Sequence, residues 1–195
     1  NIGLVTAAVF VNLDDDELPE LALATEWGPI RIFKNPGGKF TAATKAWGLD
    51  QRPGVWQTLA VGDFDNDGRF DLIAGNWGLN SPYKHGEKRV PYLVHGDIGG
   101  DGFYDALEAR FDVASQRLLP RHQLVTLELL FPFLREKFPT HRGYAAATLQ
   151  QIFAGQLAGA KLLKASHLAS VLLLNRDGTF ETKPLPVEAQ LTPVN

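Results

Sequence analysis

The segment Asp63–Asp71 constrains this chain most, because its sequence DFDNDGRFD places four aspartates within nine residues. Carboxylates at positions 1, 3 and 5 of such a loop can converge on one hard cation. Gly68 at position 6 permits the positive φ of a sharp turn, and Arg69 at position 7 can offer its backbone carbonyl. The spacing favours a calcium loop over the alternative, a turn that is rich in aspartate without any metal.

The residues around this loop exclude an EF-hand. Position 9 is Asp71, and position 12 is Ala74, where an EF-hand needs a bidentate glutamate. The run "DLIAGN" after the loop is short, apolar and closed by turn residues, which is typical of a buried strand. The run "QTLAVGDF" before the loop also indicates a strand. The unit is therefore strand, metal loop, strand.

Two other segments, 12–20 and 97–105, align on the same template. The first copy has Glu17 where glycine belongs, which predicts backbone strain, and the third copy has Gly99 where a carboxylate belongs. We expect calcium affinity to fall from the second loop to the first and then to the third. The predicted ligands use side chains at positions 1, 3, 5 and 9 and the carbonyl at position 7: Asn12, Asp14, Asp16, Leu18, Glu20, Asp63, Asp65, Asp67, Arg69, Asp71, Asp97, Asp101, Phe103 and Asp105.

The β pattern continues beyond the loops. The stretches "IRIFKNPGGKFTAAT" and "SVLLLNRDGTFETKPL" each predict two strands joined by a glycine-containing turn. A strand, a calcium loop, a strand and a following hairpin make one four-stranded blade of a β-propeller. The sequence thus predicts an all-β fold of four-stranded antiparallel blades that form a partial propeller.

The stretches "VGDFDNDGRFDLIAGN" and "LLLNRDGTF" resemble FG-GAP/VCBS repeats. The longer order of features, including "GNWGLNSPYK" and "KFPTHRGYAAATLQQIF", is similar to bacterial secreted proteins related to the ASPIC/UnbV and cartilage acidic protein group. The resemblance runs nearly end to end. It implies β-propeller blades with calcium between the first two strands, and it implies no particular reaction. A complete propeller of this kind needs more blades than this chain supplies.

We expect the whole chain, 1–195, to be a fragment of one propeller domain, and its start within a β-like run without methionine or signal peptide agrees with a fragment. The expected blades are about 4–46, 56–95, and 92–111 plus 166–186. A helical insertion is expected at 112–165, within the third blade.

Apolar residues in this insertion recur at helical spacing, which predicts one buried face. Pro132 predicts a break, and Thr140 is a plausible N-cap for a further helix that Gly155 ends. We expect the segment 120–154 to pack on the propeller rather than to await a partner. The residues expected to be buried are Leu124, Leu127, Phe131, Leu134, Leu149 and Phe153.

The segment "GNWGLNSPYK" is the best candidate for a ligand-binding surface. Its ring, amide and charged groups, from Trp77, Asn80, Tyr83 and Lys84, suit a sugar or a peptide. The alternative, which we favour, is that Asn80 caps a turn together with Asn76 while Trp77 packs between blades.

The remaining composition narrows the function further. The chain has no cysteine and no apolar run long enough for a transmembrane helix, and its net charge of −3 comes without a basic stripe that would bind nucleic acid. Its five histidines follow no metal or catalytic spacing. We therefore expect a calcium-stabilised extracellular, periplasmic or outer-surface module, bacterial and non-catalytic, that binds a protein or glycan or serves as a scaffold. The alternative is the propeller of a polysaccharide lyase.

Overall fold

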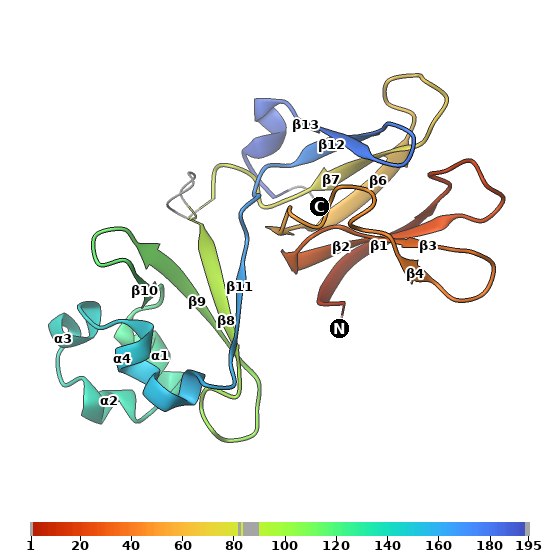
Figure 1. The fold of residues 1–195 in the computed structure, drawn as a ribbon. Coiled ribbons are helices and arrows are strands. Elements are labelled where there is room, and N and C mark those ends of the chain that lie inside the picture. The colour runs from red at the N-terminus through yellow and green to blue at the C-terminus, as the bar shows by residue number, and fades with distance from the viewer. Residues whose placement is uncertain (1, 82, 84–89, 194–195) are drawn as a thin grey trace. The chain divides into compact units, whose positions relative to one another are not determined.

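The chain divides into two units in the computed structural model, which describes residues 2–81, 83 and 90–193. One unit combines Asn1–Lys84 with Ala165–Asn195, and the other is His85–Lys164. Antiparallel β-sheets dominate both units (Figure 1). The described residues form three such sheets and no closed propeller or barrel.

The first unit contains two sheets. The strands of the first sheet lie in the order β1-β2-β3-β4, and β5 pairs with β2. These strands are β1 (Leu4–Val11), β2 (Glu20–Gly28), β3 (Arg31–Lys34), β4 (Thr41–Ala42) and β5 (Gly54–Val55). The second sheet has the order β13-β12-β7-β6. It consists of β6 (Thr58–Gly62), β7 (Asp71–Gly75), β12 (Val171–Asn175) and β13 (Phe180–Pro184).

The C-terminal hairpin β12–β13 corrects the predicted blade boundaries. It was expected in the third blade, but β12 pairs with β7 and so completes the second sheet. Buried polar groups explain this pairing, because the backbone N–H of Asn76 donates to Ser170 Oγ over 3.0 Å and the Asn76 side chain donates to the His167 carbonyl. Unpaired, these buried groups would be costly.

A common core joins the two sheets of the first unit. Ala22, Ala24 and Ile32 from the first sheet share one hydrophobic cluster with Leu72 and Leu173 from the second. Burial of a side chain of the size of leucine or isoleucine contributes about 1.5–3 kcal/mol to folding. The short 3₁₀ helix η2 (Val187–Gln190) follows β13 in this unit.

The second unit has one sheet with four helices on it. The strand order is β10-β9-β8-β11, with the bounds β8 (Pro91–Gly96), β9 (Asp105–Asp112), β10 (Arg117–Pro120) and β11 (Lys161–Lys164). The predicted insertion 112–165 is thus not wholly helical, because β10 and β11 lie inside it. The helices are α1 (Leu124–Leu130), α2 (Leu134–Lys137), α3 (His141–Ala145) and α4 (Leu149–Phe153), and α4 runs into the 3₁₀ helix η1 (Ala154–Leu157).

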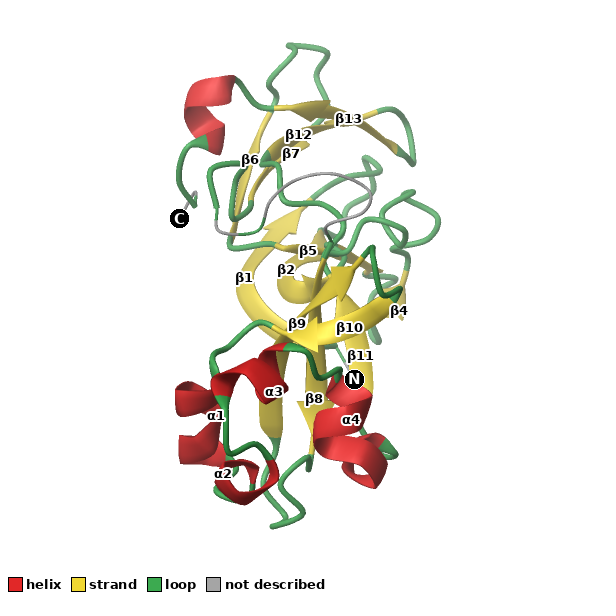
Figure 2. Ribbon diagram, turned by 90° about the vertical axis from the view of Figure 1, so that its left-hand side faces the viewer, coloured by secondary structure: helices red, strands yellow, loops and turns green. Residues whose placement is uncertain are grey.

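The helices pack on their own sheet, as expected (Figures 1 and 2). All six residues predicted to be buried lie in one cluster with Val94, Leu107 and Ala109 of the sheet. The predicted break at Pro132 separates α1 from α2, and Thr140 caps α3 by accepting from the Gly143 N–H.

The end of the helical segment differs from the prediction in two ways. A second N-cap, Thr148, divides the expected last helix into α3 and α4, and a capping box with Gln151 stabilises the start of α4. That helix ends at Ala154, with φ of 44°, and not at Gly155. Within the described part of the chain, no helix is long and apolar enough to cross a membrane.

Candidate metal-binding loops

Three acidic loops occupy equivalent places in the three sheets. Each connects the first two strands of its sheet: residues 12–20 between β1 and β2, 63–71 between β6 and β7, and 97–105 between β8 and β9. They are called here the first, second and third loop. The first and second loops belong to the first unit, and the third loop belongs to the second unit.

The carboxylate at position 9 closes each loop in the same way. One of its oxygens accepts a hydrogen bond from the backbone N–H at position 2, seven residues earlier. The pairs are Leu13 to Glu20 Oε2 (2.9 Å), Phe64 to Asp71 Oδ2 (2.9 Å) and Ile98 to Asp105 Oδ2 (3.0 Å). The same bond in all three loops supports the internal repeat that the sequence alignment predicts.

The aspartate at position 5 forms a second common bond, with the backbone N–H at position 7. The pairs are Leu18 to Asp16 (2.7 Å), Arg69 to Asp67 (3.0 Å) and Phe103 to Asp101 (3.0 Å). This bond fixes the turn at position 7. The carbonyls of Leu18, Arg69 and Phe103 remain predicted ligands.

The backbone turns at two positions, of which the sequence analysis identified one. Gly68 and Gly102 at position 6 have φ of 87°, as expected, but Glu17 at that position of the first loop is outside the left-handed region, so the predicted strain is absent. Position 4 is left-handed in every loop, with φ of 59° at Asp15, 59° at Asn66 and 75° at Gly100. Aspartate, asparagine and glycine are the residues that tolerate this conformation, and their recurrence at position 4 was the missed signal.

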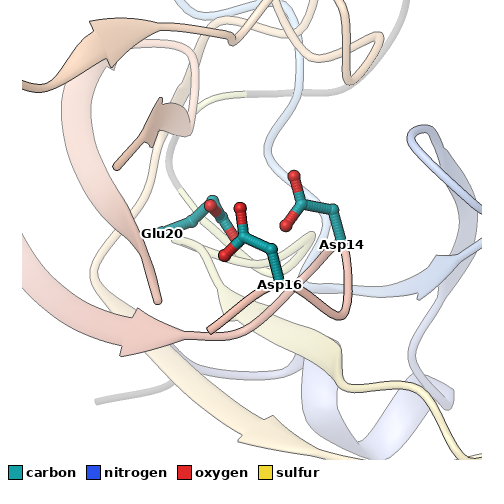
Figure 3. Close-up of side chains that lie close together, drawn as sticks. All are labelled: Asp14, Asp16 and Glu20. Atoms are coloured by element: carbon teal, nitrogen blue, oxygen red, sulfur yellow. The ribbon is translucent and has the colours of Figure 1, made fainter. Parts of the chain in front are cut away.

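The first loop gathers Asp14, Asp16 and Glu20, each with an oxygen within 4.8 Å of the others (Figure 3). Glu20 is fully buried, and its Oε1 has no hydrogen-bond partner among the described residues. The buried Oδ1 of Asn12 is also unpartnered, while its Nδ2 donates to the Asp16 carbonyl. Unpaired buried oxygens next to exposed carboxylates fit a bound cation, because a buried acceptor without a partner is otherwise costly.

The second loop gathers Asp63, Asp65 and Asp71 within the same 4.8 Å limit. The fourth predicted side chain, Asp67, lies outside this group. Its Oδ2 accepts from Arg69 Nη2 over 2.6 Å, and the Arg69 backbone N–H is the main reason why the pKa of Asp67 is below its usual value. The structure thus brings together three of the four predicted side chains of this loop.

A basic side chain from the following hairpin lies against each of these two groups. Lys34, at the end of β3, pairs with Asp14 and lies 3.7 Å from Asp16. Arg176, just after β12, pairs with Asp65 over 2.7 Å and with Asp67 over 3.1 Å. Hydrogen bonds to the carboxylates raise the pKa values of both basic groups. No local pattern in the sequence predicts that these two basic residues meet the loops.

The third loop has the same backbone but gathers fewer charges. Both oxygens of Asp97 accept backbone N–H groups, from Asp101 at 3.0 Å and from Gly102 at 3.1 Å. Of the described residues, only the first and second loops contain three acidic side chains with converging oxygens. Gly99 leaves position 3 of the third loop without a side chain, and this accounts for the difference.

The aromatic segment after β7 is not the exposed cluster that a binding surface would require. Tyr83 is only 3% exposed, and it packs on Trp77 with ring centroids 4.8 Å apart. The side chain of Asn80 donates to the Leu191 carbonyl over 3.3 Å. Lys84 lies outside the described residues. The contact of Trp77 agrees with the packing role that the favoured alternative gives it, but Asn80 bonds to a distant carbonyl and does not cap a local turn among the described residues. Ligand binding by this segment stays a prediction.

Comparison with known proteins agrees with this arrangement. Residues 12–74, which include the first and second loops, match the model of the FG-GAP-like repeat. This repeat favours a β-propeller-like binding module. The chain is also similar to Cartilage acidic protein 1 of Homo sapiens, with 27% identity over 129 residues. The aligned part is 66% of this chain and 18% of that protein. The predicted resemblance to FG-GAP repeats is thus confirmed, and no solved structure matches the chain.

Proposed function

We propose that this chain is part of a calcium-stabilised, extracytoplasmic β-propeller that binds a protein or glycan and catalyses no reaction. The observation that carries the proposal is the buried Oε1 of Glu20, which has no hydrogen-bond partner in the described part of the chain and lies beside Asp14 and Asp16 within an FG-GAP-like repeat. A buried carboxylate oxygen without a partner calls for a cation.

Calcium suits these loops better than magnesium. The donors are carboxylate, amide and carbonyl oxygens, which Ca²⁺ accepts in flexible coordination, whereas Mg²⁺ requires a tight octahedron and retains its water. The residues that would hold the ion are Asp14, Asp16 and Glu20 with Asn12 in the first loop, and Asp63, Asp65 and Asp71 in the second. When bound, calcium would neutralise the repelling carboxylates of each loop.

The three loops would differ in affinity in the predicted order, second, first and third. Both loops bring three carboxylates together, and each faces one basic side chain, Lys34 or Arg176. The second loop has Asp63 at position 1, where the first has the neutral Asn12. Since Glu17 is not strained, the difference between these two loops is smaller than the sequence indicates. The third loop would bind weakest, because Gly99 supplies no oxygen from a side chain.

The enzyme alternative can be weighed at a cavity of the second unit. A cavity of about 330 Å³ in the second unit is lined by Arg110, His122, His141 and Tyr144, among others. The Tyr144 hydroxyl donates to the backbone carbonyl of His122 over 2.8 Å, and burial raises the pKa of Tyr144 to about 12. A hydroxyl that is already bonded and remains protonated at neutral pH is poorly suited as a general base, so a base in this cavity would be one of the two histidines.

Calorimetric titration of the whole chain tests the proposal. We expect calcium to bind with dissociation constants in the micromolar to millimolar range and to raise the melting temperature, with a much weaker response to magnesium. A hundredfold excess over the dissociation constant adds about 2.7 kcal/mol per site. The absence of any calcium response would refute the metal sites. Calcium-dependent formation of unsaturated ends from uronate-containing polysaccharides, abolished by His122→Ala, would instead establish the enzyme.

A further inference from the structure

Asn175, the last residue of β12, lies between the first and second loops and hydrogen-bonds to both. Its Nδ2 donates to the Leu13 carbonyl of the first loop over 2.7 Å. Its backbone N–H donates to Asp71 Oδ1 of the second loop over 2.8 Å, and Nδ2 also reaches the Phe70 carbonyl at 3.3 Å. A single residue from a distant part of the sequence therefore connects two loops whose equivalent positions are 51 residues apart in the sequence.

These bonds extend to the two carboxylates at position 9. The Leu13 N–H donates to Glu20 Oε2 over 2.9 Å, so Glu20, Leu13, Asn175 and Asp71 form one continuous path. All four residues are buried, with Glu20, Asn175 and Asp71 at 0% exposure. Hydrogen bonds that are shielded from water are stronger than exposed ones, and they hold their partners in fixed positions.

The side-chain amide of Asn175 contributes through the hydrogen bonds that its Nδ2 donates. Its Oδ1 is buried and has no hydrogen-bond partner among the described residues, which is an unfavourable arrangement for a side chain whose only purpose is to fill space. Leucine has a similar size and would fill the same volume without that cost. The position requires an N–H group directed at Leu13.

We propose that Asn175 couples the two metal loops, so that a cation held by one loop raises the affinity of the other. This inference rests on the proposed calcium sites. A cation that fixes Glu20 through Oε1 also fixes Leu13 through Oε2, and the Leu13 carbonyl then orients Asn175, whose N–H positions Asp71. Binding of the first ion thus fixes residues that the second ion would otherwise have to order. The second ion therefore binds more tightly, which is positive cooperativity.

The coupling is reciprocal by thermodynamic necessity, so each loop changes the affinity of the other by the same factor. Typical couplings between sites amount to about 5–150-fold. The third loop has no part in this path, since Asp105 accepts only from Ile98 and Gly99 of its own loop among the described residues.

Calcium titrations of the unmodified whole chain and of its variants test the proposal. Asp14→Asn with Asp16→Asn disables the first loop, and Asp63→Asn with Asp65→Asn disables the second. We expect each change to lower the calcium affinity of the remaining loop by about fivefold or more. In an Asn175→Leu background, the same two changes should leave the calcium affinity of the remaining loop almost unchanged. Gln57→Leu is the control, because Gln57 is another amide of this unit, partly buried, whose side chain donates to Glu26, outside both loops.

The outcomes separate the possible explanations. If the loops bind calcium independently in the unmodified chain, the coupling is refuted while the metal sites stand, and this result does not depend on whether Asn175→Leu folds. A second outcome is that Asn175→Leu lowers the melting temperature and the calcium affinities of both loops, while the factor by which disabling one loop weakens the other stays the same. In that case the role of Asn175 is structural and the proposal fails. If the unmodified chain binds no calcium, the proposed function fails and the coupling with it.

Discussion

The second and third loops have the same backbone but differ in the charges they gather. In both, the two oxygens of the first aspartate accept the N–H groups at positions 5 and 6, and the carboxylate at position 9 accepts the N–H at position 2. Only the second loop brings three carboxylates within 4.8 Å, because Asp65 occupies the position that is Gly99 in the third. Hydrogen bonds within the loop thus determine its shape, whereas the side chain at position 3 determines whether three carboxylates converge.

The largest effect is expected from removal of Asp65. Asp65→Ala should abolish most of the calcium-dependent stabilisation of the second loop, about 2.7 kcal/mol at a hundredfold excess over the dissociation constant. Asp14→Ala should cost less, because we expect the first loop to be the weaker site. Thermal melts with calcium and with a chelator measure both. Glu188→Ala, an exposed carboxylate outside the loops, is the control. A larger loss in Asp14→Ala would show that flanking structure outweighs ligand count.

The converse change should create a site. In Gly99→Asp, a Cβ at residue 99 would lie 3.6 Å from Asp101 Cγ and 3.6 Å from Asp105 Oδ2, which is ordinary contact and directs the new side chain towards these carboxylates. We expect the third loop to gain about tenfold in calcium affinity, about 1.4 kcal/mol. Without calcium, the added charge should instead lower stability.

Gly159→Asp is the matched control for this gain, because it adds the same charge to the same unit at a position with no atom within 4 Å of its Cβ. Equal calcium responses of the two variants, or no response from Gly99→Asp, would show that position 3 does not determine metal binding.

A pH effect should distinguish the second unit from the first. The Tyr144 hydroxyl donates to the His122 carbonyl, and burial raises the pKa of Tyr144 from the usual 10.0 to about 12 in the folded state. Its contribution to stability is therefore fully present below pH 10 and is lost as pH rises through about 12. Tyr144→Phe should lose about 1 kcal/mol at neutral pH and less at high pH. Tyr104→Phe, at a residue that is 79% exposed, is the control. A loss that does not change with pH would contradict the assignment.

Local patterns in the sequence were sufficient to predict the acidic loops and the helical segment. The strand–loop–strand units and the break at Pro132 depend on residues that are close in the sequence, so spacing and turn chemistry determine them. The strands β10 and β11 were missed because they flank helices within a segment whose strongest periodicity is helical.

The features that escaped prediction depend on pairings between distant residues. The contact of β12 with β7 joins residues about a hundred positions apart, as do the bonds of Arg176 to Asp65 and of Asn175 to Asp71. No local pattern specifies which of several acidic loops a given asparagine or arginine will meet. The burial of Tyr83 has the same origin, since Ala165 and Leu168 from the C-terminal segment lie in its cluster.

The smallest effect concerns the basic side chain that distinguishes the first loop from the third. Lys34 pairs with Asp14 and Asp16, whereas no ion pair involves the third loop among the described residues. An ammonium group at these carboxylates must be displaced when calcium binds, so Lys34→Gln should raise the calcium affinity of the first loop. An ion pair at an exposed site is weak, which limits the gain to about fivefold. Calorimetry at low salt measures it, and the gain should shrink as added salt screens the charges. Lys39→Gln, on the same hairpin and in no ion pair of the described chain, should leave the affinity unchanged. If Lys34→Gln instead weakens calcium binding, the lysine positions the aspartates for the metal and does not compete with it.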